Sequence, residues 1–213
     1  MISFVASKGG PGKSTLATHC AVCAAQQGLN VLILDMDSQG SIRDWYDKRL
    51  QTVPTSTNSG HLSVRHIALS GLADAVSRAK ATDIDILVID TAGDDRLSAV
   101  SVVGISDQVF IPSRPTEKDL KGAAKTYRVV SRQHKPYAFI LNQTPPRTPA
   151  KGGRVREAAQ VLFALGPLAP VPIVTRVDYP DADGLGLGVT EYNPTGKAAS
   201  DIAALWSWIE NNQ

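Results

Sequence analysis

The chain has 213 residues, of which 43% are hydrophobic, and a formal net charge of +2. This length suits one α/β domain with a core large enough to fold alone, so we expect a single domain over residues 1–213. No stretch approaches the roughly eighteen apolar residues that a bilayer-spanning helix needs, and no basic, cleavable leader precedes the first apolar run. We therefore expect a cytoplasmic protein without a transmembrane segment.

Apolar runs alternate with helical patterns along the chain, which is typical of a mostly parallel, doubly wound sheet with helices on both faces. The predicted strands are 2–6, 31–34, 61–68, 84–89, 109–111, 137–141 and a short last one at 171–173. The predicted helices are 15–27, 44–50, 71–81, 117–133, 154–165 and a C-terminal helix with one apolar face formed by Ile202, Leu205, Trp206 and Ile209. Pro, Gly and polar residues predict surface loops at 52–60 and 144–153, the second of them mobile.

A glycine-rich segment joins the first predicted strand to the first predicted helix. It reads Lys8-Gly9-Gly10-Pro11-Gly12-Lys13-Ser14-Thr15. Glycines let successive N–H groups turn toward phosphate oxygens, and the following helix N-terminus adds partial positive charge. In such a loop Lys13 would hold the β- and γ-phosphates of a nucleotide and Ser14 would ligate Mg²⁺. Glycine-lysine clusters also occur in ordinary turns, but the strand-to-helix context favours a phosphate loop.

Lys8 is not needed to bind one nucleotide and requires a separate role. The segment resembles the signature Lys-Gly-Gly-x-Gly-Lys-[Ser/Thr]-[Ser/Thr] of the ParA/MinD family of deviant Walker A ATPases. The resemblance implies a P-loop ATPase that uses ATP and Mg²⁺ and forms a sandwich homodimer on ATP binding. It further implies that Lys8 acts in trans on the partner's nucleotide, as an arginine finger does.

The resemblance extends over almost the whole chain. Asp35-Met36-Asp37-Ser38-Gln39-Gly40 is similar to the family's Asp-x-Asp-Pro-Gln-Gly segment, in which the second aspartate, here Asp37, helps to position the attacking water. Ser38 departs from the usual proline. Asp90 ends a strand similar to Walker B and would polarise Mg²⁺ through water, while Asn142 stands where the family reads adenine. Further similar stretches are Pro112 to Leu120, with the pattern Pro-x-x-Pro-[Ser/Thr]-x-x-Asp-Leu, and Gly186 to Ala199.

Three aspartates, Asp35, Asp37 and Asp90, follow hydrophobic strands, at the sheet edge where open α/β sheets bind ligands. Strand-end aspartates also serve as turn or helix caps. Because of the adjacent loop we assign Asp37 and Asp90 to the site, together with Ser14 as metal-binding residues, and regard Asp35 as structural.

Positive charge is concentrated between Arg114 and Arg156, where eleven Lys and Arg face only two acidic residues. Helical spacing of three and four places five of them on one side of a helix: Lys118, Lys121, Lys125, Arg128 and Arg132. Four more follow in the loop and the next helix: Arg147, Lys151, Arg154 and Arg156. These groups could bind DNA without reading bases, as the resemblance also implies, although a solubilising face is the alternative.

Other residues with possible chemistry receive structural interpretations. Cys20 and Cys23 lie on one predicted helix without a second cluster to complete a metal site, so we expect core residues. Their position also argues against a nitrogenase-reductase-like role, which needs cysteines after the Walker B region. The histidines show no ligand spacing and are expected to be structural: His19, His61, His66 and His134.

Several relatives share this nucleotide switch. A membrane-cycling, MinD-like protein would need a basic amphipathic tail, but residues 201–213 contain Asp201 and Glu210 and no Lys or Arg, so membrane binding is disfavoured. The extra N-terminal helix-turn-helix domain of large plasmid ParA proteins is also not seen. We therefore expect a short ParA-type ATPase that is nucleoid-associated and is stimulated by a ParB-like adaptor or a cargo-linked protein. It would segregate plasmid or chromosome DNA or position a protein assembly. The alternative is a protein-recruiting or membrane-cycling, MinD-like regulatory ATPase that does not bind DNA.

Overall fold

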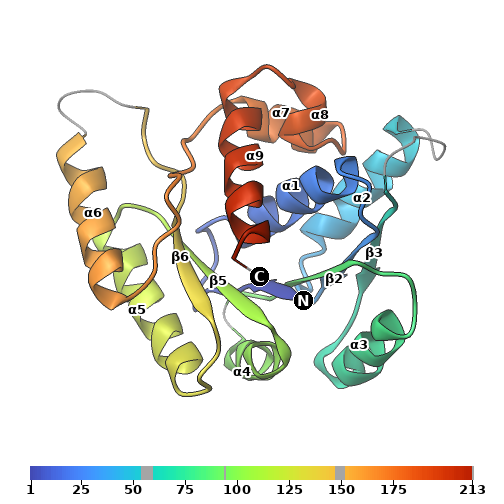
Figure 1. Cartoon of the computed structure of the whole chain (residues 1–213), viewed down its shortest axis with the longest axis horizontal. Coiled ribbons are helices and arrows are strands. Elements are labelled where there is room, and N and C mark those ends of the chain that lie inside the picture. Colours follow the sequence, from blue (N-terminus) through green and yellow to red (C-terminus); the bar gives the residue numbers. More distant parts are fainter. Residues whose placement is uncertain (54–59, 94, 147–151, 213) are drawn as a thin grey trace.

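The computed structural model describes residues 1–53, 60–93, 95–146 and 152–212. Its centre is a six-stranded sheet with the order β3-β2-β4-β1-β5-β6 (Figure 1), in which every named pairing is parallel. The strands are β1 (Ile2–Phe4), β2 (Val31–Asp35), β3 (Leu62–His66), β4 (Ile86–Asp90), β5 (Gln108–Ser113) and β6 (Tyr137–Leu141). The predicted parallel α/β architecture is confirmed.

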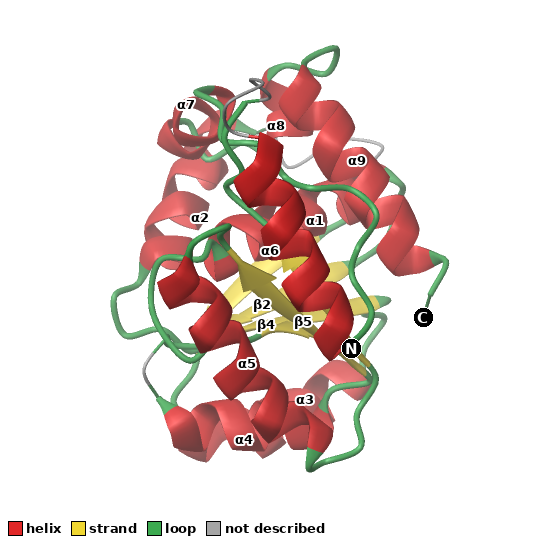
Figure 2. Ribbon diagram, turned by 90° about the vertical axis from the view of Figure 1, so that its left-hand side faces the viewer, coloured by secondary structure: helices red, strands yellow, loops and turns green. Residues whose placement is uncertain are grey.

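Helices cover both faces of the sheet (Figure 2). One face carries α1 (Lys13–Gln26), α2 (Ser41–Thr52), α7 (Asp178–Gly184), α8 (Val189–Tyr192) and α9 (Lys197–Glu210). The other carries the 3₁₀ turn η1 (Leu69–Gly71), α3 (Leu72–Lys80), α4 (Arg96–Ile105), α5 (Glu117–Ser131) and α6 (Gly152–Leu165).

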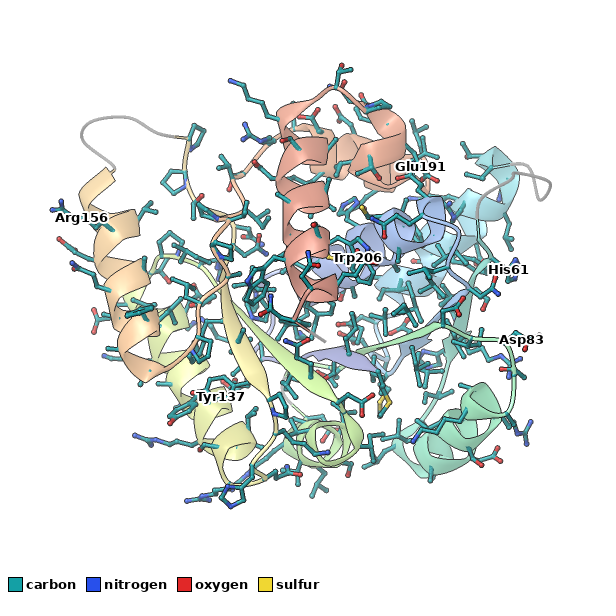
Figure 3. The ribbon with its side chains drawn as sticks, viewed as in Figure 1. His61, Asp83, Tyr137, Arg156, Glu191 and Trp206 are labelled. Carbon is teal, nitrogen blue, oxygen red and sulfur yellow. The ribbon has the colours of Figure 1, made fainter. Side chains whose placement is uncertain are left out.

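Strand side chains alternate between two apolar clusters, one on each face. Ile33 of β2 packs with α1 and α9, whereas its neighbours Leu32 and Leu34 pack toward α3 and α4. This is the period-two alternation of a strand buried on both sides. On α9 the predicted apolar face is confirmed, and Trp206 points inward (Figure 3) with its indole N–H donating to Gln27 Oε1 at 2.7 Å.

The predicted strand at 171–173 is wrong. The segment after α6 forms two isolated bridges and no continuous ladder. One joins Leu168 to Phe139 of β6, and the other joins Val174 to Thr144, which follows β6. The predicted loop at 144–153 is also too long, because α6 begins at Gly152. Residues 147–151, on which the expected mobility falls, lie outside the described residues, as do residues 54–59 of the first predicted loop.

The cysteine prediction is confirmed, because Cys20 and Cys23 are free, buried and part of the apolar cluster around α1. Among the described residues no group of His, Cys, Asp and Glu side chains is arranged to hold a metal ion by itself. No helix in the described part of the chain is long and apolar enough to span a membrane.

Candidate nucleotide-binding site

The predicted phosphate loop follows β1, whose neighbours in the sheet are β4 and β5. This is the topological switch point of the sheet, where open α/β folds bind ligands. Gly10 and Gly12 have φ values of +97° and +88°, which glycine adopts without strain. A Cβ on Gly12 would lie 2.3 Å from Asn142 Nδ2, so the loop also needs glycine here for the close approach of that side chain. The backbone therefore has the curled form that presents N–H groups to phosphate.

The end of the loop is attached to the sheet. Lys13 is the first residue of α1 and is buried, and Ser14 Oγ donates to Asp90 Oδ2 at 2.5 Å. Asp90 is itself fully buried and pairs in register with Asp35, so the two carboxyl groups stand at the ends of adjacent strands. The predicted neighbourhood of Lys13, Ser14 and Asp90 is present.

The burial and hydrogen bonding of Asp90 favour binding of a cation at its carboxylate. Its Oδ1 atom is buried without a hydrogen-bond partner among the described residues. Burial raises its pKa to about 7, while the Ser14 hydrogen bond and the nearby Lys13 charge oppose that rise. A divalent ion beside Ser14 and Asp90 would relieve the unfavourable burial of this carboxylate, and oxygen ligands are those that Mg²⁺ prefers.

Asp35 and Asp37 differ in their surroundings. Asp35 is fully buried, its Oδ1 accepts from the Asp37 N–H at 2.9 Å, and burial raises its pKa. Asp37 is only partly buried, and its Oδ1 accepts from the Gln39 N–H at 3.0 Å. Asp35 therefore orients the turn that carries Asp37, while Asp37 remains partly exposed just after the end of β2.

Lys8, at the entrance of the loop, turns away from the phosphate cradle. Its ammonium lies 2.6 Å from Asp119 Oδ1 on α5, and its side chain packs against Gly122. Asp119 also accepts from Arg114 Nε at 2.9 Å. Although burial raises its pKa, the hydrogen bonds from Lys8, Thr116 and Arg114 hold the pKa of Asp119 below its ordinary value. Sequence reasoning missed this pair; the Asp-Leu end of the Pro-x-x-Pro stretch, which contains Asp119, was the available signal.

Asn142 braces the loop from the side of β6. It is 3% exposed, and its Nδ2 donates to the carbonyl of Pro11 at 2.7 Å. Gln143, which the sequence reasoning did not single out, adopts a left-handed φ of +50° and donates from Nε2 to Gly10 O at 3.1 Å. Both residues line a hollow of about 270 Å³ beside Thr15, closed by residues 173–176 and α7. A nucleotide base could enter this hollow, next to the residue expected to read adenine.

The predicted basic stripe is on the surface. All five of its residues are exposed, four on α5 and the last, Arg132, directly after it: Lys118, Lys121, Lys125, Arg128 and Arg132. Lys121 is partly neutralised by Glu117, whose carboxylate lies 2.6 Å from its ammonium. Arg156 projects from the separate helix α6 (Figure 3), and Arg154 is exposed on the same helix, so these two residues do not extend the stripe along α5. Arg147 and Lys151 lie outside the described residues.

Comparisons with known proteins agree with this geometry. A family model described as the CobQ/CobB/MinD/ParA nucleotide binding domain matches residues 2–158. Protein IncC of Escherichia coli is 24% identical over 95% of this chain and 66% of its own length, and Protein ParA of Rhizobium radiobacter is 26% identical over 62% and 57%. The chain thus spans two thirds or less of these curated relatives. The septum site-determining protein MinD of Pyrococcus horikoshii, complexed with Mg-ADP, superimposes with a TM-score of 0.76 at 19% identity, covering 99% of this chain and 96% of that one.

A parallel sheet whose central strand leads through a glycine-rich loop into a helix, with a buried aspartate on the next strand, defines a P-loop nucleotide-binding domain. Within that class, the chain belongs to the CobQ/CobB/MinD/ParA nucleotide binding domain family, whose model matches most of its length.

Proposed function

We propose that this protein is a ParA-type ATPase that dimerises on binding Mg-ATP, binds DNA without sequence specificity and hydrolyses ATP when an adaptor stimulates it. Its cycle of binding and release would segregate plasmid or chromosome DNA or position a protein cargo over the nucleoid. The partners are a second copy of the chain, DNA and a ParB-like or cargo-linked stimulator.

The position of Lys8 is the observation that supports this proposal most strongly. Lys13 lies within the loop at the start of α1, where it can serve the chain's own nucleotide, so a second lysine is redundant there. Lys8 instead is held by Asp119 with 20% of its side chain exposed. Arg114 and Thr116 also donate hydrogen bonds to Asp119, so this buried carboxylate keeps partners when Lys8 leaves it. The phosphates of a partner's nucleotide would give Lys8 another anion to bind.

Each remaining residue of the site has a role in the proposed reaction. Lys13 and the loop N–H groups would bind the phosphates, and Ser14 and Asp90 would hold Mg²⁺, which would supply positive charge against the phosphate oxygens. Asp37 orients the attacking water, and Lys8 of the partner subunit stabilises the charge that develops as the terminal phosphate leaves.

DNA binding would use the stripe on α5. Exposed Lys and Arg neutralise backbone phosphates without contacting bases, so affinity is sequence-independent and falls steeply with salt. A dimer doubles the number of such contacts, which explains why DNA retention would depend on ATP. Hydrolysis would then release the subunits, and the adaptor would set where this happens.

The test is retention of unrelated duplex DNA with ATP, ADP or no nucleotide at two salt concentrations. The parent should bind only with ATP and only at low salt. The triple variant Lys121→Ala/Lys125→Ala/Arg128→Ala should lose DNA but keep nucleotide binding. Lys8→Ala should lose both ATP-driven dimers and DNA retention.

Failure of the parent to retain DNA in any nucleotide state would contradict the proposed DNA binding. If ATP still produced dimers under those conditions, the protein-recruiting alternative would replace it. The exposed triple variant Arg78→Ala/Lys80→Ala/Arg65→Ala is the matched control, because it removes the same amount of charge from β3 and α3.

A further inference from the structure

A hollow of about 450 Å³ opens between α4 and α5, on the side of the sheet opposite α1. The two helices are in contact, with α4 at the lower edge of the molecule and α5 above it (Figure 2). The hollow shares no lining residue with the one beside Thr15 and Asn142, nor with a further hollow between Ser14 and α2. It is therefore distinct from the candidate nucleotide site. Its size falls within the range of small-molecule sites, which is roughly 300–1,000 Å³.

The walls of the hollow combine an apolar interior with a cationic rim. Its apolar lining is formed by Val5, Ala6, Ala99 and Val129. Four exposed cations surround it: Arg96 at the start of α4, and Lys125, Arg128 and Arg132 near or on the second half of α5. Among the described residues none of these four forms a salt bridge.

Among the described residues, Asp95 is the acidic residue that lines the hollow, and local contacts occupy its carboxylate. Asp95 caps α4, and its carboxylate accepts from the N–H groups of Leu97 and Ser98 at 2.9 and 3.1 Å and from Ser98 Oγ at 2.5 Å. Its negative charge is therefore directed at the helix N-terminus, where it is stabilised by the helix dipole. The rim retains an excess of positive charge around a concave, partly apolar surface.

We propose that this hollow binds a small phosphate-bearing molecule with an apolar body. Arginine guanidinium groups from two helices can engage phosphate oxygens in a fixed fork, which makes them suited to this group. A duplex backbone could supply phosphates to the rim but not an apolar body to the interior. The observations therefore favour a small ligand, and DNA is the competing source of the same chemistry.

The position of the hollow links such a ligand to Lys8. The hollow is lined by Ser7 and Gly93, and Ser7 directly precedes Lys8. A Cβ on Gly93 would lie 2.4 Å from Gly9 N, so these two segments are packed backbone to backbone. The Ser7 N–H donates to Thr126 Oγ1 at 2.9 Å, on the helix that carries Asp119. A molecule in the hollow would contact Ser7, the residue before Lys8, and α5, the helix whose Asp119 binds the Lys8 ammonium. Its binding should therefore change the reactivity of Lys8.

The first measurement is titration of Mg-ADP-saturated protein with phenyl phosphate by calorimetry, with benzyl alcohol as the uncharged control. Saturable binding of phenyl phosphate alone is expected. The double variant Arg96→Gln/Arg128→Gln should weaken it by at least about tenfold, as expected for the loss of two charge-assisted contacts. The control Arg78→Gln/Lys80→Gln on α3 should stay within about twofold of the parent. No saturable binding, or equal binding by the Arg96→Gln/Arg128→Gln variant, would overturn the proposal.

Two further measurements identify which phosphates bind the rim and whether their binding affects Lys8. A 24-base-pair duplex is added as competitor; displacement of phenyl phosphate would assign the rim to DNA phosphates and overturn the small-ligand assignment, whereas undiminished binding supports it. Lys8 acylation, followed by mass spectrometry, should change several-fold when phenyl phosphate is present, and an unchanged rate would overturn the link to Lys8. The calorimetry and the acylation use ADP-loaded protein, so they remain valid if ATP-driven dimerisation or hydrolysis fails. The duplex competition is run with ATP at low salt, the state in which the proposed function expects DNA retention.

Discussion

The two lysines of the phosphate loop lie in contrasting surroundings. Lys13 is 5% exposed and belongs to α1, and the adjacent Ser14 bonds to the buried Asp90 of β4. Lys8 reaches the opposite helix layer, where Asp119 of α5 holds it in a partly exposed ion pair. One end of the loop is therefore fixed to the core and the other to a helix that can be influenced from the surface. Under the proposed function, the Lys13 end binds the nucleotide and the Lys8 end is available to a partner.

Removal of the fixed lysine should have the largest effect. Lys13→Ala deletes a charge that would contact two phosphates, so the affinity for Mg-ADP should fall by at least about 100-fold, or about 2.7 kcal/mol. Calorimetric titration measures this directly. Lys80→Ala, an exposed lysine on α3, should leave the affinity unchanged; a loss below about tenfold for Lys13→Ala would contradict the assigned binding end.

Backbone packing at Gly93 supports the Lys8 end of the loop. Gly93→Ala would place a Cβ 2.4 Å from Gly9 N and 2.6 Å from Lys8 C. Because both neighbours are backbone atoms, the loop itself must shift, and we expect destabilisation by about 2–3 kcal/mol. Urea unfolding provides the measurement. Gly71→Ala is the control, since no atom lies within 4 Å of its Cβ position, and equal stability of the two variants would argue against close packing at Gly93.

Neutralising Asp119 tests whether its ion pair with Lys8 keeps that lysine from binding a partner's nucleotide. Asp119→Asn leaves Lys8 and Arg114 without their carboxylate, and the free energy of unfolding should fall by about 1–2 kcal/mol. Under the proposed function, Lys8 is released and ATP-driven association should occur at several-fold lower protein concentration, as seen by sedimentation. Glu117→Gln removes the exposed partner of Lys121 and serves as control. Weaker association by Asp119→Asn would show that Asp119 positions Lys8 for its role instead of restraining it.

The pH dependence of stability tests how deeply α1, the helix that begins at Lys13, is buried. His19 on α1 is fully buried, and its Nδ1 accepts from the Val189 N–H at 3.2 Å. Burial lowers its pKa to about 3, so the unfolded chain takes up a proton at higher pH than the folded chain does. This contribution to stability is complete above the unfolded pKa of about 6.5 and falls as the pH drops toward 3, by about 1.4 kcal/mol per pH unit.

The corresponding variant is His19→Gln, measured by urea unfolding between pH 7 and pH 4. It should be less stable than the parent at pH 7, yet lose this part of the pH dependence. His61→Gln changes an exposed histidine and should retain the parental slope. An unaltered slope in His19→Gln would mean that other groups cause the acid sensitivity.

Local patterns sufficed for the elements that carry the site. The buried strands at 31–34 and 137–141 were placed within one residue, because uninterrupted apolar runs bounded by polar residues are distinctive. Helix α4 was not predicted, since its sequence is rich in valine and small residues and lacks a clear amphipathic period. The last predicted strand failed because a short apolar segment can contact a sheet through single bridges, which only its neighbours decide.

The sequence by itself determined the loop from Lys8 to Thr15, the order of strands and helices around it, and the placement of Asp35 and Asp90 at strand ends. These features depend on short-range geometry: glycine dihedrals, helix starts and the common edge reached by parallel strands. The tertiary structure alone decided that Lys8 pairs with Asp119, that Asn142 braces Pro11, and that Arg96 joins the α5 cations around one hollow. Such contacts join segments far apart in the chain, and their geometry follows from how the helices pack on the two faces of the sheet.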